Sequence, residues 1–131
     1  MVPPVDTHAA RRPLTSTVPK PVVPLVDRPF IQFMLDWLRS HGVDEVIMGC
    51  GHMADGVRSV LGDGSGFGIK LSFLVEPRPL GTGGALKFAE DLLDERFLML
   101  NGDVLTDLDL SAQIAQHEAT GAQATLALTP V

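Results

Sequence analysis

Apolar residues recur along this chain with a helical period in some stretches and form short continuous runs in others. After Asp27, apolar positions repeat every three to four residues from Phe30 through Met34 until Gly42 ends the pattern. This spacing predicts an amphipathic helix with Asp27 as its N-cap and Pro29 in its first turn. The same period predicts three further helices, over residues 53–62, from Thr82 to Leu93, and over residues 111–120.

Short apolar runs bounded by glycine, proline or acidic residues separate these helices. They predict strands over residues 44–49, 69–76, 96–100 and 124–131. Strand and helix therefore alternate, which predicts an α/β fold with a mostly parallel sheet and helices on both faces. No crossover follows the last strand, so we expect an incomplete sheet that forms part of a larger fold.

Composition and charge narrow the class of protein. The chain has 131 residues, of which 45% are hydrophobic and 20% charged, and this is enough for one domain with a core. No apolar run approaches the roughly 20 residues of a membrane span, and no secretory signal is evident, so we expect a cytoplasmic protein without membrane contact. The net charge of −6 disfavours nucleic acid as a partner. The single cysteine, Cys50, ends an apolar run and is interpreted as a core residue.

The stretch PRPLGTGGAL, residues 77–86, could bind a ligand. Its glycines follow a predicted strand and open a predicted helix, where a backbone can approach a phosphate or a flat ring closely. Thr82 could cap the helix or donate to a ligand. The alternative is an ordinary helix start with a tight turn. The spacing matches neither the dinucleotide fingerprint nor a P-loop, which disfavours a dehydrogenase domain.

Two charged residues could serve an anionic ligand. Lys20 lies between two prolines that stiffen its backbone, and its ammonium could neutralise phosphate oxygens; the alternative is a solvated lysine. Asp103 ends the run FLMLNGD, and a carboxylate at a strand end could bind Mg²⁺; the alternative is an Asp that closes a turn. Asp109 precedes a helix and is interpreted as its cap. The four histidines show no ligand spacing, and none is assigned to catalysis.

Three stretches in this order resemble the sugar-1-phosphate nucleotidyltransferase family, with mannose-1-phosphate guanylyltransferases and glucose-1-phosphate thymidylyltransferases the most similar branches. They begin RPLTSTVPKP, EPRPLGTGGAL and FLMLNGD, and the resemblance covers residues 12–131. It implies a Rossmann-like fold and an enzyme that joins a nucleoside triphosphate, GTP or dTTP, to a hexose 1-phosphate with Mg²⁺. The products would be a nucleotide-diphosphate sugar and pyrophosphate.

The resemblance also implies roles for particular residues. Lys20 would be the catalytic residue that contacts the phosphates, and Asp103 would bind Mg²⁺. The base and ribose would lie against a nucleotide-binding set formed by Glu76, Pro79, Gly81, Thr82 and Gly84. Such a reaction depends on alignment and charge neutralisation, which is why no catalytic histidine or cysteine is needed.

The chain departs from the family pattern before Arg12. The family has an apolar strand and a glycine-rich phosphate loop there, whereas this chain has VPPVDTHAAR, with Ala10 at the position of the loop arginine and Arg11 one residue away. We therefore expect an irregular segment over residues 1–11 and a partial nucleotidyltransferase domain over residues 12–131, truncated at both ends and without the sugar-binding half. The alternative to an active enzyme is an inactive nucleotide-binding or regulatory remnant. A sheet without its usual first strand should also expose an apolar edge, which predicts self-association.

Overall fold

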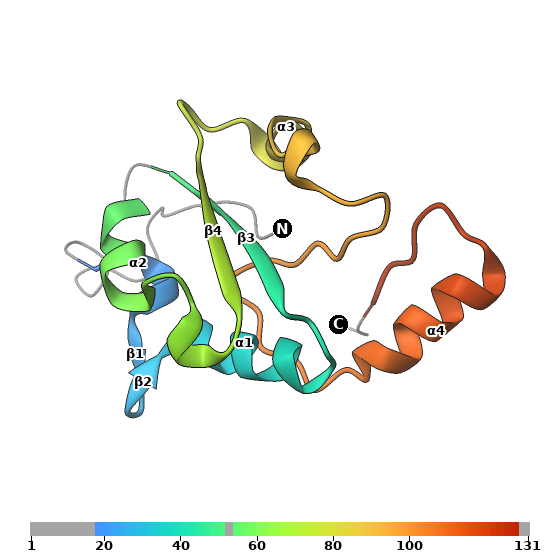
Figure 1. The fold of residues 1–131 in the computed structure, drawn as a ribbon, viewed down its shortest axis with the longest axis horizontal. Coiled ribbons are helices and arrows are strands. Elements are labelled where there is room, and N and C mark those ends of the chain that lie inside the picture. The colour runs from blue at the N-terminus through green and yellow to red at the C-terminus, as the bar shows by residue number, and fades with distance from the viewer. Residues whose placement is uncertain (1–17, 52–53, 129–131) are drawn as a thin grey trace.

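The structure is a computed structural model that describes residues 18–51 and 54–128 (Figure 1). Strands β3 and β4 form its centre, and the helices lie around them. The elements in chain order are η2 (Lys20–Val22), β1 (Pro24–Leu25), β2 (Arg28–Pro29), α1 (Phe30–Ser40), β3 (Glu45–Cys50), α2 (Ala54–Leu61), η3 (Ser65–Phe67), β4 (Lys70–Val75), α3 (Gly81–Phe88), η4 (Glu90–Leu92) and α4 (Leu110–Thr120). None of the helices in this described part combines the length and apolar character that crossing a bilayer requires.

The central sheet consists of β3 and β4, which run parallel with Glu45 opposite Lys70 and Cys50 opposite Val75. The chain passes from one strand to the other through α2, as a parallel pair requires. The hydrogen-bond ladder between β3 and β4 continues one residue past β4, because the Glu76 amide donates to the Cys50 carbonyl at 3.0 Å. A separate antiparallel hairpin of two residues per strand, β1 with β2, was not predicted from the sequence.

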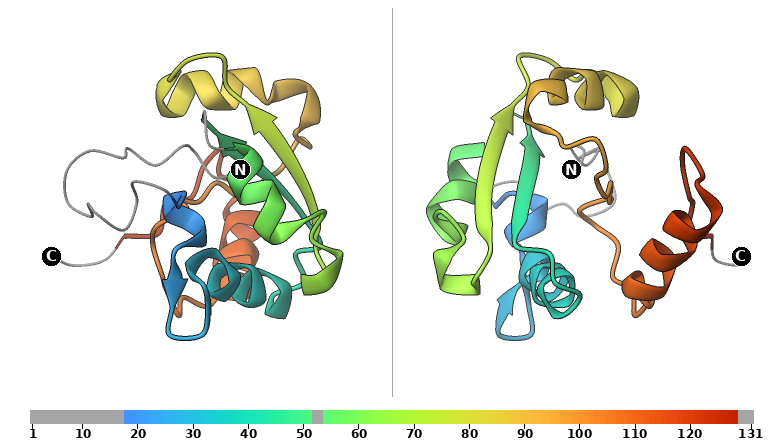
Figure 2. Two further views of the ribbon diagram at one scale, coloured as in Figure 1. Left: turned by 90° about the vertical axis from the view of Figure 1, so that its left-hand side faces the viewer. Right: turned by 45° about the vertical axis from the view of Figure 1, so that its right-hand side comes forward.

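Both faces of the sheet carry helices, as predicted. The main core joins α1 and α2 to one face of the strands through Leu35, Val57, Met48 and Leu71. A smaller cluster joins Leu74 of β4 to Ala85 and Ala89 at α3. Because side chains alternate along a strand, Leu71 and Leu74 point to opposite faces. Figure 2 shows α3 and α2 on different sides of the strand pair.

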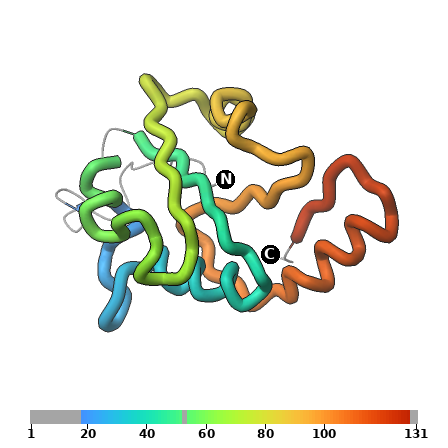
Figure 3. The backbone as a smooth tube through the Cα atoms, viewed as in Figure 1, coloured from blue at the N-terminus to red at the C-terminus, as the bar shows by residue number. Residues whose placement is uncertain are grey.

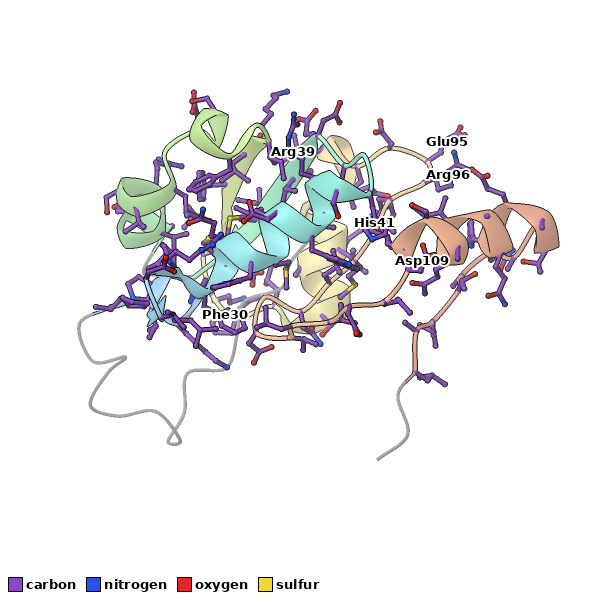
Figure 4. All side chains as sticks on the ribbon, turned by 90° about the horizontal axis from the view of Figure 1, so that it is seen from below. Phe30, Arg39, His41, Glu95, Arg96 and Asp109 are labelled. Carbon is purple, nitrogen blue, oxygen red and sulfur yellow. The ribbon has the colours of Figure 1, made fainter. Side chains whose placement is uncertain are left out.

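Helix α4 lies at the far end of the molecule from α2. Figure 3 traces the chain from α3 back past the strands and on to α4. Two contacts hold its beginning to α1, since the Trp37 indole donates to the Leu108 carbonyl at 3.1 Å and His41 Nδ1 lies 2.8 Å from Ser111 Oγ. Figure 4 shows His41, at the end of α1, beside the start of α4 near Asp109.

Asp109 caps α4 as predicted, and its carboxylate accepts from the Ala112 amide at 3.0 Å. The helix also ends at Gly121 as predicted, with φ of 58°. The predicted cap of α1 is wrong. The N-cap position belongs to Pro29, without a side-chain hydrogen bond, and Asp27 lies instead in the hairpin turn with its carboxylate 3.5 Å from Arg28 Nε.

Two predicted strands and one predicted helix length are wrong. Residues 96–100 and 124–128 have no strand structure, and residues 129–131 lie outside the described ranges. Leu98 and Leu100 nevertheless pack against the main core, so the apolar pattern reported burial rather than sheet pairing. Helix α3 ends at Phe88 rather than Leu93, and a separate 3-10 turn, η4, follows it.

Candidate functional site

Lys20 and Asp103 lie together, although 83 residues separate them in the sequence. Lys20 Nζ donates to Asp103 Oδ2 at 2.6 Å. The lysine side chain is 15% exposed and the aspartate side chain 30% exposed, so the pair is largely withdrawn from water but still reachable. This geometry is that of a strong charge-assisted hydrogen bond.

The position of Lys20 follows from how η2 packs. Val22 is buried in the main core, and its amide closes the turn on the Pro19 carbonyl at 3.0 Å. Pro19 lies directly against Gly56 of α2, where a Cβ atom would come within 2.9 Å of the proline Cγ. A side chain at residue 56 would therefore push η2 away. Helix α2 begins just after β3 ends, so this packing brings Lys20 toward the carboxyl edge of the sheet.

Asp103 reaches the pair from the segment that follows η4. Leu100 is partly buried against the core, and the turn at Gly102 and Asp103 comes next, with Gly102 buried. The burial of these neighbours fixes the direction of the turn and aims the carboxylate at Lys20. Asp103 thus lies in a turn, as the alternative to a ligand role predicted, and its carboxylate also pairs with Lys20.

The loop between β4 and α3 holds the predicted nucleotide-binding residues. Glu76 is the one charged residue in the described ranges that is buried, with 6% exposure. Its Oε2 accepts from the Leu80 amide at 3.1 Å and so closes the loop. Its Oε1 is buried without a hydrogen-bond partner among the described residues. A buried carboxylate oxygen without a partner is costly, and a donor supplied by a ligand is one way to remove that cost.

The structure gives different reasons for glycine at different positions of this loop. Gly81 begins α3 with φ of 68°, a conformation that favours glycine. Gly84 lies against Leu80, because a Cβ atom there would come within 2.8 Å of the Leu80 Cβ. A Cβ atom at Gly83 would meet nothing within 4 Å. Leu80, not Thr82, is the N-cap residue, so the capping interpretation of Thr82 is wrong; Thr82 and Pro79 are both exposed.

The predicted site residues thus form two groups. Lys20 and Asp103 are joined directly, whereas Glu76 is joined to the loop through Leu80. Within the described ranges no hydrogen bond or ion pair links the two groups. Sequence reasoning missed the backbone amide of Leu80 and the packing of Pro19 on Gly56, since neither leaves a signal in the residue pattern. The positions of Ala10 and Arg11, which the resemblance singled out, lie outside the described residues.

Cys50 lies next to Glu76 at the end of β3 and behaves as a core residue. Burial raises the pKa of its thiol to about 11, against the opposing effect of Arg58 and with a smaller rise from the negative charge of Glu76. Because the thiolate is the reactive form, a thiol with this pKa is a poor nucleophile near neutral pH. This agrees with the interpretation of Cys50 from the sequence.

The donor atoms of Asp103 are suited to a Mg²⁺ ion. Its carboxylate offers hard oxygen donors, and only Oδ2 is engaged by Lys20. No group of three or more acidic, histidine or cysteine side chains in the described ranges could form a closed metal cage. Magnesium commonly uses one or two carboxylates and completes its shell with water and phosphate, which suits this arrangement.

Comparison with known proteins identifies the family. Residues 11–131 match the model of the family described as nucleotidyl transferase. The chain is 35% identical over 127 residues to a UTP–glucose-1-phosphate uridylyltransferase of Synechocystis sp., covering 88% of this chain and 33% of that protein. It is 35% identical over 121 residues to the mannose-1-phosphate guanylyltransferase of Mycobacterium tuberculosis, covering 92% of this chain and 34% of that protein. This chain thus spans about a third of the length of these two relatives.

Solved structures also resemble this chain. The crystal structure of HddC from Yersinia pseudotuberculosis matches with a TM-score of 0.71 and 31% identity, over 79% of this chain and 48% of that one. The same protein complexed with GMP-PN matches with a TM-score of 0.72 and 28% identity, over 82% of this chain and 48% of that one. The resemblance drawn from the sequence motifs is confirmed, and the α/β fold is the one these structures share. The chain belongs to the nucleotidyl transferase family.

Proposed function

We propose that this chain forms the nucleotide-binding part of a sugar-1-phosphate nucleotidyltransferase, which uses a nucleoside triphosphate and a hexose 1-phosphate. The observation that carries the proposal is the pairing of Lys20 with Asp103 across 83 residues. A cation for phosphate oxygens and a carboxylate for a metal ion are both needed at a triphosphate, and here they occupy one place. The names of the relatives, which are sugar-1-phosphate uridylyl- and guanylyltransferases, support the same reaction class.

The chemistry needs charge neutralisation more than an acid or a base. An oxygen of the sugar phosphate attacks the α-phosphorus, a new P–O bond forms, and the bond to the leaving pyrophosphate breaks. In this proposal Lys20 donates to phosphate oxygens and offsets the charge that moves onto pyrophosphate. Asp103 holds Mg²⁺; members of this family generally use a divalent metal, which neutralises phosphate charge when bound.

The loop from Glu76 to Gly84 would hold the base in this proposal, and its chemistry favours guanine. Guanine presents two neighbouring donors, N1–H and the N2 amino group, on one edge. Oε1 of Glu76 could accept from one of them, and Oε2 keeps an acceptor site for the other beside its bond from Leu80. The buried, unpartnered Oε1 of Glu76 supports this assignment because it is an acceptor without a donor. Thymine offers a single ring N–H and would satisfy the carboxylate less well. We therefore propose GTP ahead of dTTP.

The test mixes the purified chain with GTP, mannose 1-phosphate and Mg²⁺ and measures pyrophosphate release. A parallel titration calorimetry series measures binding of GTP and dTTP with Mg²⁺ present. Turnover above the enzyme-free blank, together with tighter binding of GTP, is the expected result. Binding without turnover would instead support the non-catalytic nucleotide-binding module, and the absence of both would overturn the proposed function.

A further inference from the structure

The two charged residues of the proposed phosphate site neutralise each other in the ligand-free chain. Lys20 Nζ lies 2.6 Å from Asp103 Oδ2, and the two side chains are only 15% and 30% exposed. The lysine cannot offer its full charge to a phosphate while it donates to this carboxylate, and Oδ2 of the carboxylate is not open to a metal ion. We propose that this ion pair is a latch that must open before either ligand binds fully, and that its opening couples metal binding to nucleotide binding. This inference rests on the proposed function.

The metal ion and the nucleotide each compete with one partner of the ion pair. A metal ion that binds Oδ2 of Asp103 must displace the lysine, and one that binds Oδ1 is repelled by the ammonium beside it; a nucleotide that binds Lys20 must likewise compete with the carboxylate. When one ligand opens the pair, the second ligand binds residues that are already free, so it binds more tightly than it would alone. The free-energy cost of breaking the ion pair is met once, although both ligands then bind. By linkage, each ligand raises the affinity for the other by the same factor.

Partial burial makes this competition significant. An ion pair on an open surface is weak and would barely compete with a ligand. The other ion pairs of the described residues are of that kind: in the Lys70–Glu45 pair, for example, the side chains are 70% and 53% exposed. The Lys20–Asp103 pair is the most buried pair recorded in the described ranges. Its partners also come from η2 and from the segment after η4, so the core packing of both segments holds them together.

The nucleotide arm of the test uses Asp103→Asn in the presence of EDTA. Without its carboxylate partner, Lys20 is free for phosphate, so the variant should bind metal-free GTP about fivefold more tightly than the parent chain in calorimetry. Asp107→Asn is the matched control. It removes the same charge from an exposed residue nearby and should leave the metal-free affinity for GTP unchanged.

The metal arm uses Lys20→Met, which keeps the apolar stem of the side chain and removes the ammonium. Titration with Mn²⁺ in the absence of nucleotide, followed by the electron paramagnetic resonance signal of the free ion, should show about fivefold tighter binding than in the parent chain. Lys70→Met is the control, because it opens an exposed ion pair far along the strands and should change nothing. Thermal melting of each variant checks that it is folded.

The outcomes separate the two proposals. Tighter metal-free binding of GTP by Asp103→Asn and tighter Mn²⁺ binding by Lys20→Met support the latch. Unchanged or weaker values in both variants, with normal binding of GTP and Mg²⁺ together by the parent chain, overturn the latch and leave the proposed function standing. Failure of the parent chain to bind GTP even with Mg²⁺ overturns both. An ion pair away from the ligand site would not make either variant bind a ligand more tightly.

Discussion

Glu76 combines a buried charge with an unsatisfied oxygen at the mouth of the loop that follows β4. One oxygen closes the loop on Leu80, and the other has no partner among the described residues. Leaving a buried acceptor unpaired costs about 1–3 kcal/mol, so an uncharged residue would fold more easily here. The free energy that the residue costs in the unbound chain is available to a ligand that supplies a donor.

Replacing Glu76 with glutamine tests this interpretation. The amide oxygen can still accept from Leu80, but the substitution removes one acceptor and the negative charge. We expect GTP affinity to fall by roughly ten- to a hundredfold, in line with the loss of a hydrogen bond between charged and neutral groups, while dTTP affinity falls less. The free energy of unfolding in urea should stay equal or rise.

Glu95→Gln is the control for this variant, because Glu95 is an exposed carboxylate outside the loop. It should leave the affinity for both nucleotides unchanged. Equal GTP affinity in the parent chain and in Glu76→Gln would contradict the assignment of the base to this carboxylate.

Val26 carries strain that has no evident use. It is the one non-glycine residue with positive φ, 63°, in the described ranges, and its side chain is 94% exposed at the tip of the β1–β2 hairpin. A β-branched residue is poorly suited to this conformation. Val26→Gly should therefore raise the free energy of unfolding by about 0.5–1 kcal/mol, measured by urea denaturation. A loss of stability would show that the hairpin does not hold this conformation in solution.

At the scale of single elements, neighbouring glycines of α3 differ in their surroundings. Gly84 allows Leu80 to pack closely across the first turn, whereas Gly83 faces open space. Leu80 is also the residue whose amide Glu76 holds. The close contact at Gly84 therefore supports the geometry of the whole loop from β4 to α3, and Gly83 does not.

A matched pair of alanine substitutions separates these roles. Gly83→Ala should stabilise the chain by about 0.5–1 kcal/mol, because alanine is the better helix former and the new methyl group meets nothing. Gly84→Ala should destabilise it by about 1–3 kcal/mol, because its Cβ atom would overlap Leu80. Thermal melting and GTP titration check both variants, and similar effects of the two substitutions would contradict the contact with Leu80.

The elements also show what the sequence could and could not predict. Helices α1 and α4 were predictable because their signals are local: apolar spacing, the cap at Asp109 and the stop at Gly121. Residues 96–100 have the composition of a strand, but strand structure requires a partner at the right distance, and composition does not report that. The family resemblance implied roles for Lys20 and Asp103 at a triphosphate, but it did not predict their direct contact, and no spacing rule connects residues so far apart. The hydrogen bond from Leu80 to Glu76 depends on a backbone amide, which has no sequence signature.

At the scale of the whole molecule, large apolar side chains remain exposed in several stretches of the described residues. Large apolar residues are exposed at several positions between residues 97 and 108, and Leu126 and Leu128 are 78% and 85% exposed. Exposed apolar side chains favour association where they gather into a patch. We expect the weight-average mass in sedimentation equilibrium to rise with protein concentration, as the exposed-edge argument from the sequence also predicted.

A double variant, Leu126→Lys with Leu128→Lys, tests the location of the associating surface. It should lower the average mass toward that of the monomer, because charge on both leucines opposes association. A parent chain that stays monomeric at every concentration would contradict the prediction. An associating parent with an unchanged double variant would place the surface elsewhere.

The ion pair between η2 and the turn after η4 has a consequence for how the protein is made. Its first partner leaves the ribosome 83 residues before its second. At typical synthesis rates this interval lasts roughly 4–17 s, far longer than local folding steps. During that time β3 and β4 can already pair around α2, since both lie within the first 75 residues. The nascent chain would therefore hold a formed sheet and an unneutralised Lys20 together, and cellular anions could reach that lysine before its carboxylate partner does.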